Sequence, residues 1–143
     1  MRRRVRASAV CVDGGEVLCV RLRDPESGIA HLFPPGGAVE AGERPAEAAA
    51  RETFEETGHR VRVRPGSERV ERYPYTWGGQ RYDVTTHFFR VDLIGDRQAR
   101  AEVQPEAIVE ASVWLPLSQL DGALGHDATI CAAVTALATD ARG

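Results

Sequence analysis

The chain has 143 residues, of which 43% are hydrophobic and 27% are charged. These values are typical of one globular domain with a hydrophobic core, so we expect a single domain over residues 1–143 and exclude a disordered or collagen-like chain. Every basic residue is an arginine, and the sequence has neither lysine nor asparagine. This composition excludes a phosphate-binding Walker lysine, a Schiff-base enzyme and a catalytic asparagine.

The apolar stretches are only a few residues long, whereas a membrane-spanning helix needs about 20. No membrane association is therefore expected. The basic start Met1–Arg6 is similar to the front of a secretion signal, but the apolar segment behind it stops at Asp13 without a cleavage-like region, so we expect a cytoplasmic protein. The three cysteines lack the spacing of a disulfide framework or a zinc site and are expected to be buried apolar side chains.

The net charge of −3 conceals a local concentration of acid, because residues 37–59 contain six acidic and only two basic residues. A carboxylate patch of this kind suits cations, and arginines around it suit phosphates. The charge distribution does not favour stable nucleic-acid binding.

Two strands joined by a tight turn are predicted at the start of the chain. The runs Val5–Val12 and Glu16–Arg23 read as strands, and the intervening Asp13–Gly15 is a hairpin turn signal. A loop is predicted over Asp24–His31. The prolines and glycines of Leu32–Gly37 then forbid a regular helix.

A helix is predicted between Pro45, which suits a first helical turn, and Gly58, which suits a helix end. At about 100° per residue, one arc of this helix carries alanine, threonine and phenylalanine and should pack against the core. The adjoining arc carries Glu52, Glu55 and Glu56. Because like charges four residues apart disfavour a helix, this cluster needs compensation, which a divalent cation with oxygen ligands would supply. The alternative is a solvated acidic face relieved by the neighbouring arginine.

The remaining sequence predicts further strands at Arg60–Arg64, Glu68–Trp77, Arg81–Leu93 and Val109–Leu115, and a second helix from about Asp127 to Arg142. No internal repeat or linker interrupts these elements. The predicted fold class is therefore α/β or α+β, with a mixed sheet and two main helices.

The acidic helix and the loop before it resemble the Nudix box, which reads G, five residues, E, seven residues, RE, a bulky aliphatic, any residue, EE, any residue, G and a bulky aliphatic. All fixed letters of the box are present. They are Gly37, Glu43, Arg51, Glu52, Glu55, Glu56 and Gly58. The two bulky aliphatic positions instead hold Thr53 and His59, which puts local packing in doubt more than the chemistry.

The resemblance extends beyond the box, because Phe33–Gly37 is similar to the Pro-Gly-Gly segment that precedes it in the family. Glu110–Leu120 is similar to the family's Trp-containing strand and the short Leu-rich turn that follows. The resemblance implies an α/β/α sandwich with a mixed β-sheet between helices. It also implies a hydrolase that uses Mg²⁺ or Mn²⁺ to cleave a nucleoside diphosphate linked to another moiety.

By position, the resemblance implies that Glu55 and Glu56 are metal ligands and that Glu52 is a ligand or the base for the attacking water. The carbonyl of Gly37 would complete the metal's ligand set. One acid from a late loop often joins such sites, and the candidates here are Glu102, Glu106 and Glu110, of which we favour Glu106.

Three further residues of the box are implied to be structural. Glu43 and Arg51 would brace the loop against the helix rather than react, and Gly58 would end the helix. The ligand set and the bracing pair together make the box a metal-binding loop–helix unit, in which the divalent ions neutralise the phosphate oxygens and deliver a deprotonated water.

Substrate-binding residues are less sharply indicated. Arg21 and Arg23 lie on one strand face and are predicted to meet substrate phosphates, with solvated arginines as the alternative. Tyr73, Tyr75 and Trp77 share a face at period two, so they form either a base-stacking platform, for which we select Tyr75 and Trp77, or ordinary sheet packing.

The expected partner is a small nucleotide-type molecule, for which ADP-ribose, a dinucleoside polyphosphate and a nucleoside triphosphate stay open; a homodimer is also compatible with the family. Two other kinds of protein have to be weighed. A Nudix-fold sensor could bind a nucleotide without cleaving it, but it would have no need for an intact glutamate set. A calcium-stabilised structural domain would be expected to carry an Asp/Asn-rich loop, which is absent from the sequence.

Overall fold

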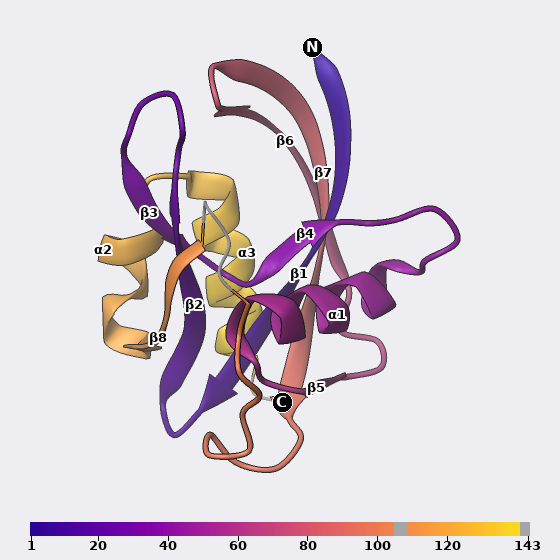
Figure 1. Cartoon of the computed structure of the whole chain (residues 1–143), viewed down its shortest axis with the longest axis vertical. Helices are drawn as coiled ribbons and strands as arrows, with labels where there is room; N and C mark the ends of the chain where they lie inside the picture. Colours follow the sequence, from indigo (N-terminus) through magenta and orange to yellow (C-terminus); the bar gives the residue numbers. More distant parts are fainter. Residues whose placement is uncertain (105–108, 141–143) are drawn as a thin grey trace.

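The computed structural model describes residues 1–104 and 109–140, which are organised around a mixed β-sheet (Figure 1). The strands are β1 (Arg2–Asp13), β2 (Glu16–Arg23), β3 (Ala30–Phe33), β4 (Gly36–Ala38), β5 (Val61–Val63), β6 (Arg69–Trp77), β7 (Gln80–Leu93) and β8 (Val109–Pro116). The helical elements are α1 (Pro45–Thr57), the 3-10 turn η1 (Leu117–Gln119), α2 (Leu120–Leu124) and α3 (Ala128–Ala138).

Strand β1 is the central strand of the sheet. It runs parallel to β7 from Arg2 to Cys11, and it pairs antiparallel with β4 and, at its end, with β2. Strand β7 pairs on its other side with β6 and β5, and β2 pairs with β3 and β8. Because side chains alternate along a strand, β1 presents one set of residues to each face of the sheet.

Helices α1 and α3 cover opposite faces of the sheet (Figure 1). On the α1 face, Ala48 and Ala49 pack with alternate residues of β1 and with Phe89 and Val91 of β7. On the α3 face, Val134 and its helix neighbours pack with Val10 of β1 and with apolar residues of β6, β7 and β8. The layering confirms the predicted α/β/α sandwich with a mixed sheet.

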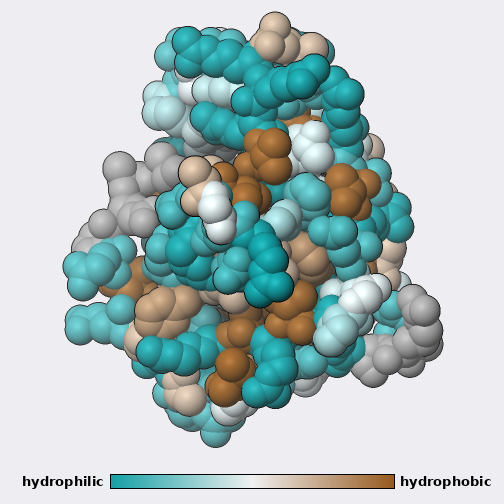
Figure 2. Space-filling model, turned by 90° about the vertical axis from the view of Figure 1, so that its right-hand side faces the viewer, coloured by the Kyte–Doolittle hydropathy of each residue, from teal (hydrophilic) through white to brown (hydrophobic). Residues whose placement is uncertain are grey.

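The start of β1 and the β6–β7 hairpin extend together beyond the helices and form one end of the molecule (Figure 1). Figure 2 shows that this end is mostly hydrophilic on the face turned to the viewer. The basic run Arg2–Arg4 is therefore part of the sheet, paired with residues 82–84 of β7, and the strand begins three residues before the predicted Val5.

The first hairpin and the main helix are confirmed, but two short strands were not predicted. The turn between β1 and β2 contains Gly14 and Gly15 with φ of 54° and 75°, as a tight hairpin requires. Strand β3 begins at Ala30, inside the segment predicted as a loop, and β4 lies among the prolines and glycines. Strand β3 pairs back on the preceding strand β2, and β4 pairs with β1, about thirty residues earlier in the chain.

The C-terminal helix is shorter than predicted. Helix α3 begins after Asp127, whose carboxylate accepts the N–H of Ile130 at 3.0 Å, and ends at Ala138 rather than near Arg142, which lies outside the described residues. Before it, η1 and α2 form where a short turn was expected. Within residues 1–104 and 109–140, no helix is long and apolar enough to cross a lipid bilayer.

Two of the cysteines are buried as expected. Burial raises the pKa of both Cys11 and Cys19 to about 12, so these thiols stay protonated and unreactive. Cys131 is only partly buried, because it lies on the outer side of α3 near Asp121.

Candidate active site

Helix α1 carries the acidic residues, and local sequence fixes both of its ends. Pro45 occupies the first turn, and the Glu47 carboxylate accepts the backbone N–H of Arg44 at 2.9 Å. At the other end Gly58 has φ of 78°, and its N–H bonds to the carbonyl of Phe54 at 2.9 Å. A Cβ on Gly58 would also overlap the carbonyl oxygen of Ala101, so only glycine fits there.

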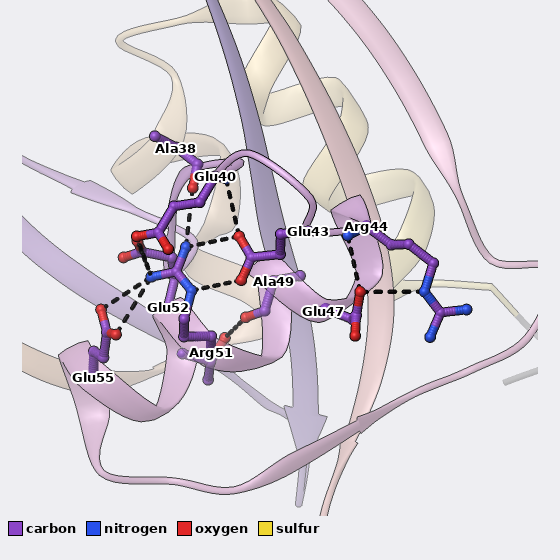
Figure 3. A network of polar contacts seen from close by, with 10 residues as sticks. Ala38, Glu40, Glu43, Arg44, Glu47, Ala49, Arg51, Glu52 and Glu55 are labelled. Atoms are coloured by element: carbon purple, nitrogen blue, oxygen red, sulfur yellow. Dashed lines mark hydrogen bonds and ion pairs between the residues drawn. The ribbon is translucent and has the colours of Figure 1, made fainter.

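Arg51 is the centre of a carboxylate network (Figure 3). Its guanidinium bonds to both oxygens of Glu43 at 2.7 and 3.0 Å and to the carbonyl of Ala38 at 3.0 Å. It also reaches Glu52 at 2.8 Å and Glu55 at 3.2 Å. The hydrogen bond from Arg51 lowers the pKa of Glu43, and the network ties the loop before α1 to the middle of the helix.

Glu52 lies directly against Gly37. A Cβ at position 37 would be 2.6 Å from each carboxylate oxygen of Glu52, so the glycine makes room for this side chain. The Glu52 side chain is 17% exposed. Burial raises its pKa, while Arg51 and Arg6 favour the ionised form. Glu52 is therefore a carboxylate held with little water around it.

Glu56 lies one helical turn after Glu52 and is 8% exposed. Its carboxylate accepts the backbone N–H of Gly36 at 2.9 Å, which connects α1 to β4. Glu52 and Glu56 line the same cavity, whereas Glu55 is 46% exposed and points towards Arg51. The structure thus brings Glu52 and Glu56 together in one cavity. Glu55, the third predicted catalytic glutamate, lies outside the lining of that cavity.

These carboxylates offer the oxygen ligands that Mg²⁺ and Mn²⁺ prefer, and the raised pKa of Glu52 shows that nearby cations do not fully offset its burial. A divalent ion would supply the missing positive charge, so the residues fit this cofactor. Within the described residues, however, no three acidic, histidine or cysteine side chains already form a metal cluster. Arg51 occupies the space between Glu52 and Glu55, and both would have to turn from it to share an ion.

The late-loop acids are placed differently from one another. Glu106, the favoured candidate, lies outside the described residues. Glu102 is exposed. Glu110 bonds to Arg23 at 2.7 and 3.1 Å, and it lines a second, shallower hollow together with Glu55 and Glu56. Of the residues that the structure describes, only Glu110 among these candidates lies beside the helix glutamates.

The cavity that contains Glu52 and Glu56 has a volume of about 290 Å³ and lies on the α3 face of the sheet. Part of its lining is aromatic. Tyr75 and Trp77 are half-buried there and both pack edge-on against Phe33, with ring centroids 6.2 and 6.3 Å from the Phe33 centroid. Tyr73 is instead buried, with its hydroxyl 2.8 Å from that of Thr86.

Arg21 and Arg23 do not line this cavity. Leu22 between them does, so strand alternation turns both arginines away. Arg21 is exposed, and Arg23 is held by Glu110 and by the carbonyl of Gly28 at 2.6 Å. The cavity receives Arg4 and Arg6 of β1 instead. These two were not predicted, because the basic start was compared only with a secretion signal. Period-two alternation would have placed both on the same face as the core residue Val10, but it could not show that this face lines a cavity.

His59 stands where the box calls for a bulky aliphatic residue. It is 3% exposed, packs edge-on against Trp114 at 5.6 Å, and its Nδ1 has no hydrogen-bond partner within the described residues. Burial lowers its pKa from the ordinary value of 6.5, and Arg100 and Arg97 lower it further. The folded protein therefore holds this imidazole neutral.

Replacing His59 by leucine should make the protein more resistant to acid. Because the folded pKa lies below the unfolded value, the neutral form stabilises the fold fully above 6.5, and this stability is lost as the pH falls below that value. Melting temperatures of the wild type and His59→Leu between about pH 8 and pH 5 would test this. We expect a smaller fall for the variant, and parallel curves would contradict the assignment.

The chain is thus a helix–sheet–helix sandwich whose cavity contains the little-exposed carboxylates of Glu52 and Glu56 together with aromatic side chains. The NUDIX domain model matches residues 1–133. The chain belongs to the Nudix family, and the predicted enzyme class, a Nudix hydrolase acting on phosphoric anhydride bonds, is confirmed.

Solved structures share the fold across most of the chain. A MutT Nudix hydrolase from Burkholderia pseudomallei is 26% identical with a TM-score of 0.59, covering 82% of this chain and 86% of its own. An Ap4A hydrolase from C. elegans is 19% identical (TM-score 0.65; 90% and 92%), and a UDP-X diphosphatase is 18% identical (0.64; 100% and 66%). No curated protein sequence matches with significance.

Proposed function

We propose that the protein is a Mg²⁺- or Mn²⁺-dependent pyrophosphohydrolase that cleaves a nucleoside diphosphate linked to another moiety. The observation that carries the proposal is a single cavity whose lining includes both Glu52 and Glu56 and the aromatic side chains of Tyr75 and Trp77. The glutamate carboxylates suit cation-bound phosphates, and the aromatic side chains suit a nucleotide base.

The chain's own residues have separate tasks in this reaction. Glu56 would hold the cation, with Glu55 joining after it leaves Arg51. Glu52 would serve either as a further ligand or as the base that accepts the proton of the attacking water. Bound divalent ions neutralise phosphate oxygens and lower the pKa of water. Arg51 and Glu43 position the glutamates through the contacts described above, and the buried Gly36–Glu56 hydrogen bond fixes the helix against β4.

The test is a hydrolysis screen with product identification over ADP-ribose, a diadenosine polyphosphate, nucleoside triphosphates and a UDP-sugar. The Ap4A hydrolase and the UDP-X diphosphatase with the same fold motivate two of these substrates. We expect cleavage of a phosphoric anhydride bond that needs Mg²⁺ or Mn²⁺ and stops with a chelator. Tight binding without any turnover would favour the alternative, a nucleotide sensor. The cytoplasmic location, the single domain and the homodimer stay predictions.

Tyr75→Ala and Trp77→Ala should each raise KM about five- to a hundredfold, with a much smaller change in kcat, because a stacked base loses about 1 to 3 kcal/mol. Both side chains are half-buried at the cavity, so we expect only modest losses of stability. Tyr73→Ala is the matched contrast, since it removes a buried ring from the same strand face and should mainly lower the melting temperature.

The measurement pairs steady-state kinetics with thermal unfolding on the three variants. A large loss of melting temperature in Tyr75→Ala or Trp77→Ala, with KM unchanged, would return these residues to the core.

A further inference from the structure

Two arginines of β1 line the cavity that contains the glutamates and the aromatic side chains. Arg4 and Arg6 are two residues apart on one strand and therefore share a face, with their Cα atoms about 6.6 Å apart. Across the sheet, the row containing Arg4 continues through Val84 of β7 to Tyr73 of β6, and the neighbouring row ends in Tyr82 and Tyr75. The arginines therefore lie beside the aromatic side chains of Tyr73, Tyr75 and Tyr82 on this face of the sheet.

In the described part of the chain, no hydrogen bond or close ion pair joins Arg4 or Arg6 to a carboxylate, although Arg6 favours the ionised form of Glu52 from a greater distance. Seven other arginines form salt bridges with acids in the described part of the chain, as in the pairs of Arg64 with Asp92 and Arg72 with Asp83. Arg4 instead lies over the ring of Tyr82, with its guanidinium carbon 4.0 Å from the ring centroid. Within the described residues no protein acceptor takes a hydrogen bond from its guanidinium, so the N–H donors are available to an anion.

The carboxylates in the same cavity have other partners. Glu52 bonds to Arg51, and Glu56 accepts the N–H of Gly36. Arg6 is near enough to Glu52 to act on it electrostatically. One cavity therefore contains the two glutamates proposed to bind a cation, the pair of arginines and the aromatic side chains.

We propose that Arg4 and Arg6 bind a phosphate additional to the two joined by the scissile bond, so that the preferred substrates carry three or more consecutive phosphates. This inference rests on the proposed function. Two phosphates would engage a cation that the α1 glutamates would hold, and a further phosphate would meet the arginine pair. A nucleoside diphosphate joined to a neutral sugar has no third phosphate for this pair to bind. It therefore cannot form the charge-assisted hydrogen bonds that such a phosphate would accept from the arginines.

The test compares ATP with ADP-ribose, because both contain adenosine diphosphate and differ in whether a phosphate or a neutral ribose follows. Equilibrium binding is measured by calorimetry with a chelator present, where no metal-dependent turnover occurs, and kcat/KM is measured separately with Mg²⁺. The variants are Arg4→Gln, Arg6→Gln and the double variant. Arg3→Gln is the matched control, because this neighbouring arginine of β1 lies on the opposite face of the strand.

The wild type and Arg3→Gln should bind ATP at least about tenfold more tightly than ADP-ribose, and the double variant should lose most of that difference. The affinity of the wild type for ATP should also fall more steeply with salt than its affinity for ADP-ribose. Equal salt slopes for the two nucleotides would contradict the additional phosphate contact, and this measurement needs no variant. The single variants assign the contact to Arg4 and Arg6 if the double variant fails to fold.

Equal or tighter binding of ADP-ribose, or a preference for ATP that survives in a folded double variant, would overturn the inference. A failure of the proposed function looks different. In that case neither nucleotide is hydrolysed with Mg²⁺ or Mn²⁺, while the arginine-dependent preference in binding is still observed.

Discussion

Glu56→Gln should lower kcat by two or more orders of magnitude while leaving the fold intact. The amide oxygen of glutamine can accept the hydrogen bond from Gly36 that the carboxylate accepts now, so the link between α1 and β4 survives. What is lost is the negative charge that would hold a divalent ion at a site only 8% exposed.

Glu47→Gln is the matched control, because Glu47 lies on the same helix but its side chain is 52% exposed and contacts Arg44. Its turnover should stay close to that of the wild type. Near-normal kcat in Glu56→Gln, or activity that survives exhaustive chelation, would contradict the metal-binding role. Circular dichroism and a melting curve of both variants would verify that the comparison concerns chemistry.

Gly36→Ala should cost about 3 kcal/mol of stability and most of the activity, because the added methyl group has no room. A Cβ at this position would overlap the hydroxyl of Ser8 and lie 2.5 Å from the carbonyl oxygen of Ala7. Both atoms belong to buried residues of the central strand, so they have little room to move. The displaced β4 would also pull the Gly36 N–H away from Glu56.

Denaturant unfolding of Gly36→Ala measures this loss, and Gly122→Ala in α2 provides the comparison. A Cβ on Gly122 meets nothing within 4 Å, so that variant should be neutral or stabilised by up to about 1 kcal/mol through helix propensity. An unchanged unfolding midpoint for Gly36→Ala would show that β4 can shift freely, and the close-packing argument would be wrong.

The sequence predicts elements whose signals are local. Pro45 and Gly58 mark the ends of α1, and the fixed spacing that joins Gly37 and Glu43 of the preceding loop to the residues of this helix carries the family resemblance. The Asp-Gly-Gly turn likewise marks the first hairpin. Each of these features depends on residues close together in the chain, where capping, helical period and turn geometry operate.

Features specified by distant partners are harder to predict. Strand β4 exists because residues 36–38 pair with Arg6–Ser8 of β1, and nothing inside that segment distinguishes it from a loop. Arg23 appeared suited to phosphate, but its partner Glu110 is 87 residues away. Arg4 and Arg6 gain their position from the pairing of β1 with β7, which the sequence does not reveal.

That pairing also has a consequence for how the chain acquires its cavity. Arg2 of β1 lies beside Tyr82 of β7, and the other edge of the sheet requires β8 to find β2. Helix α1 can form early from local contacts, whereas loops of about eighty residues must close before the arginines and aromatic rings stand together. During synthesis, the cavity is therefore completed only after most of the chain has left the ribosome. Helix α1 and its glutamates can form before the rest of the site has assembled.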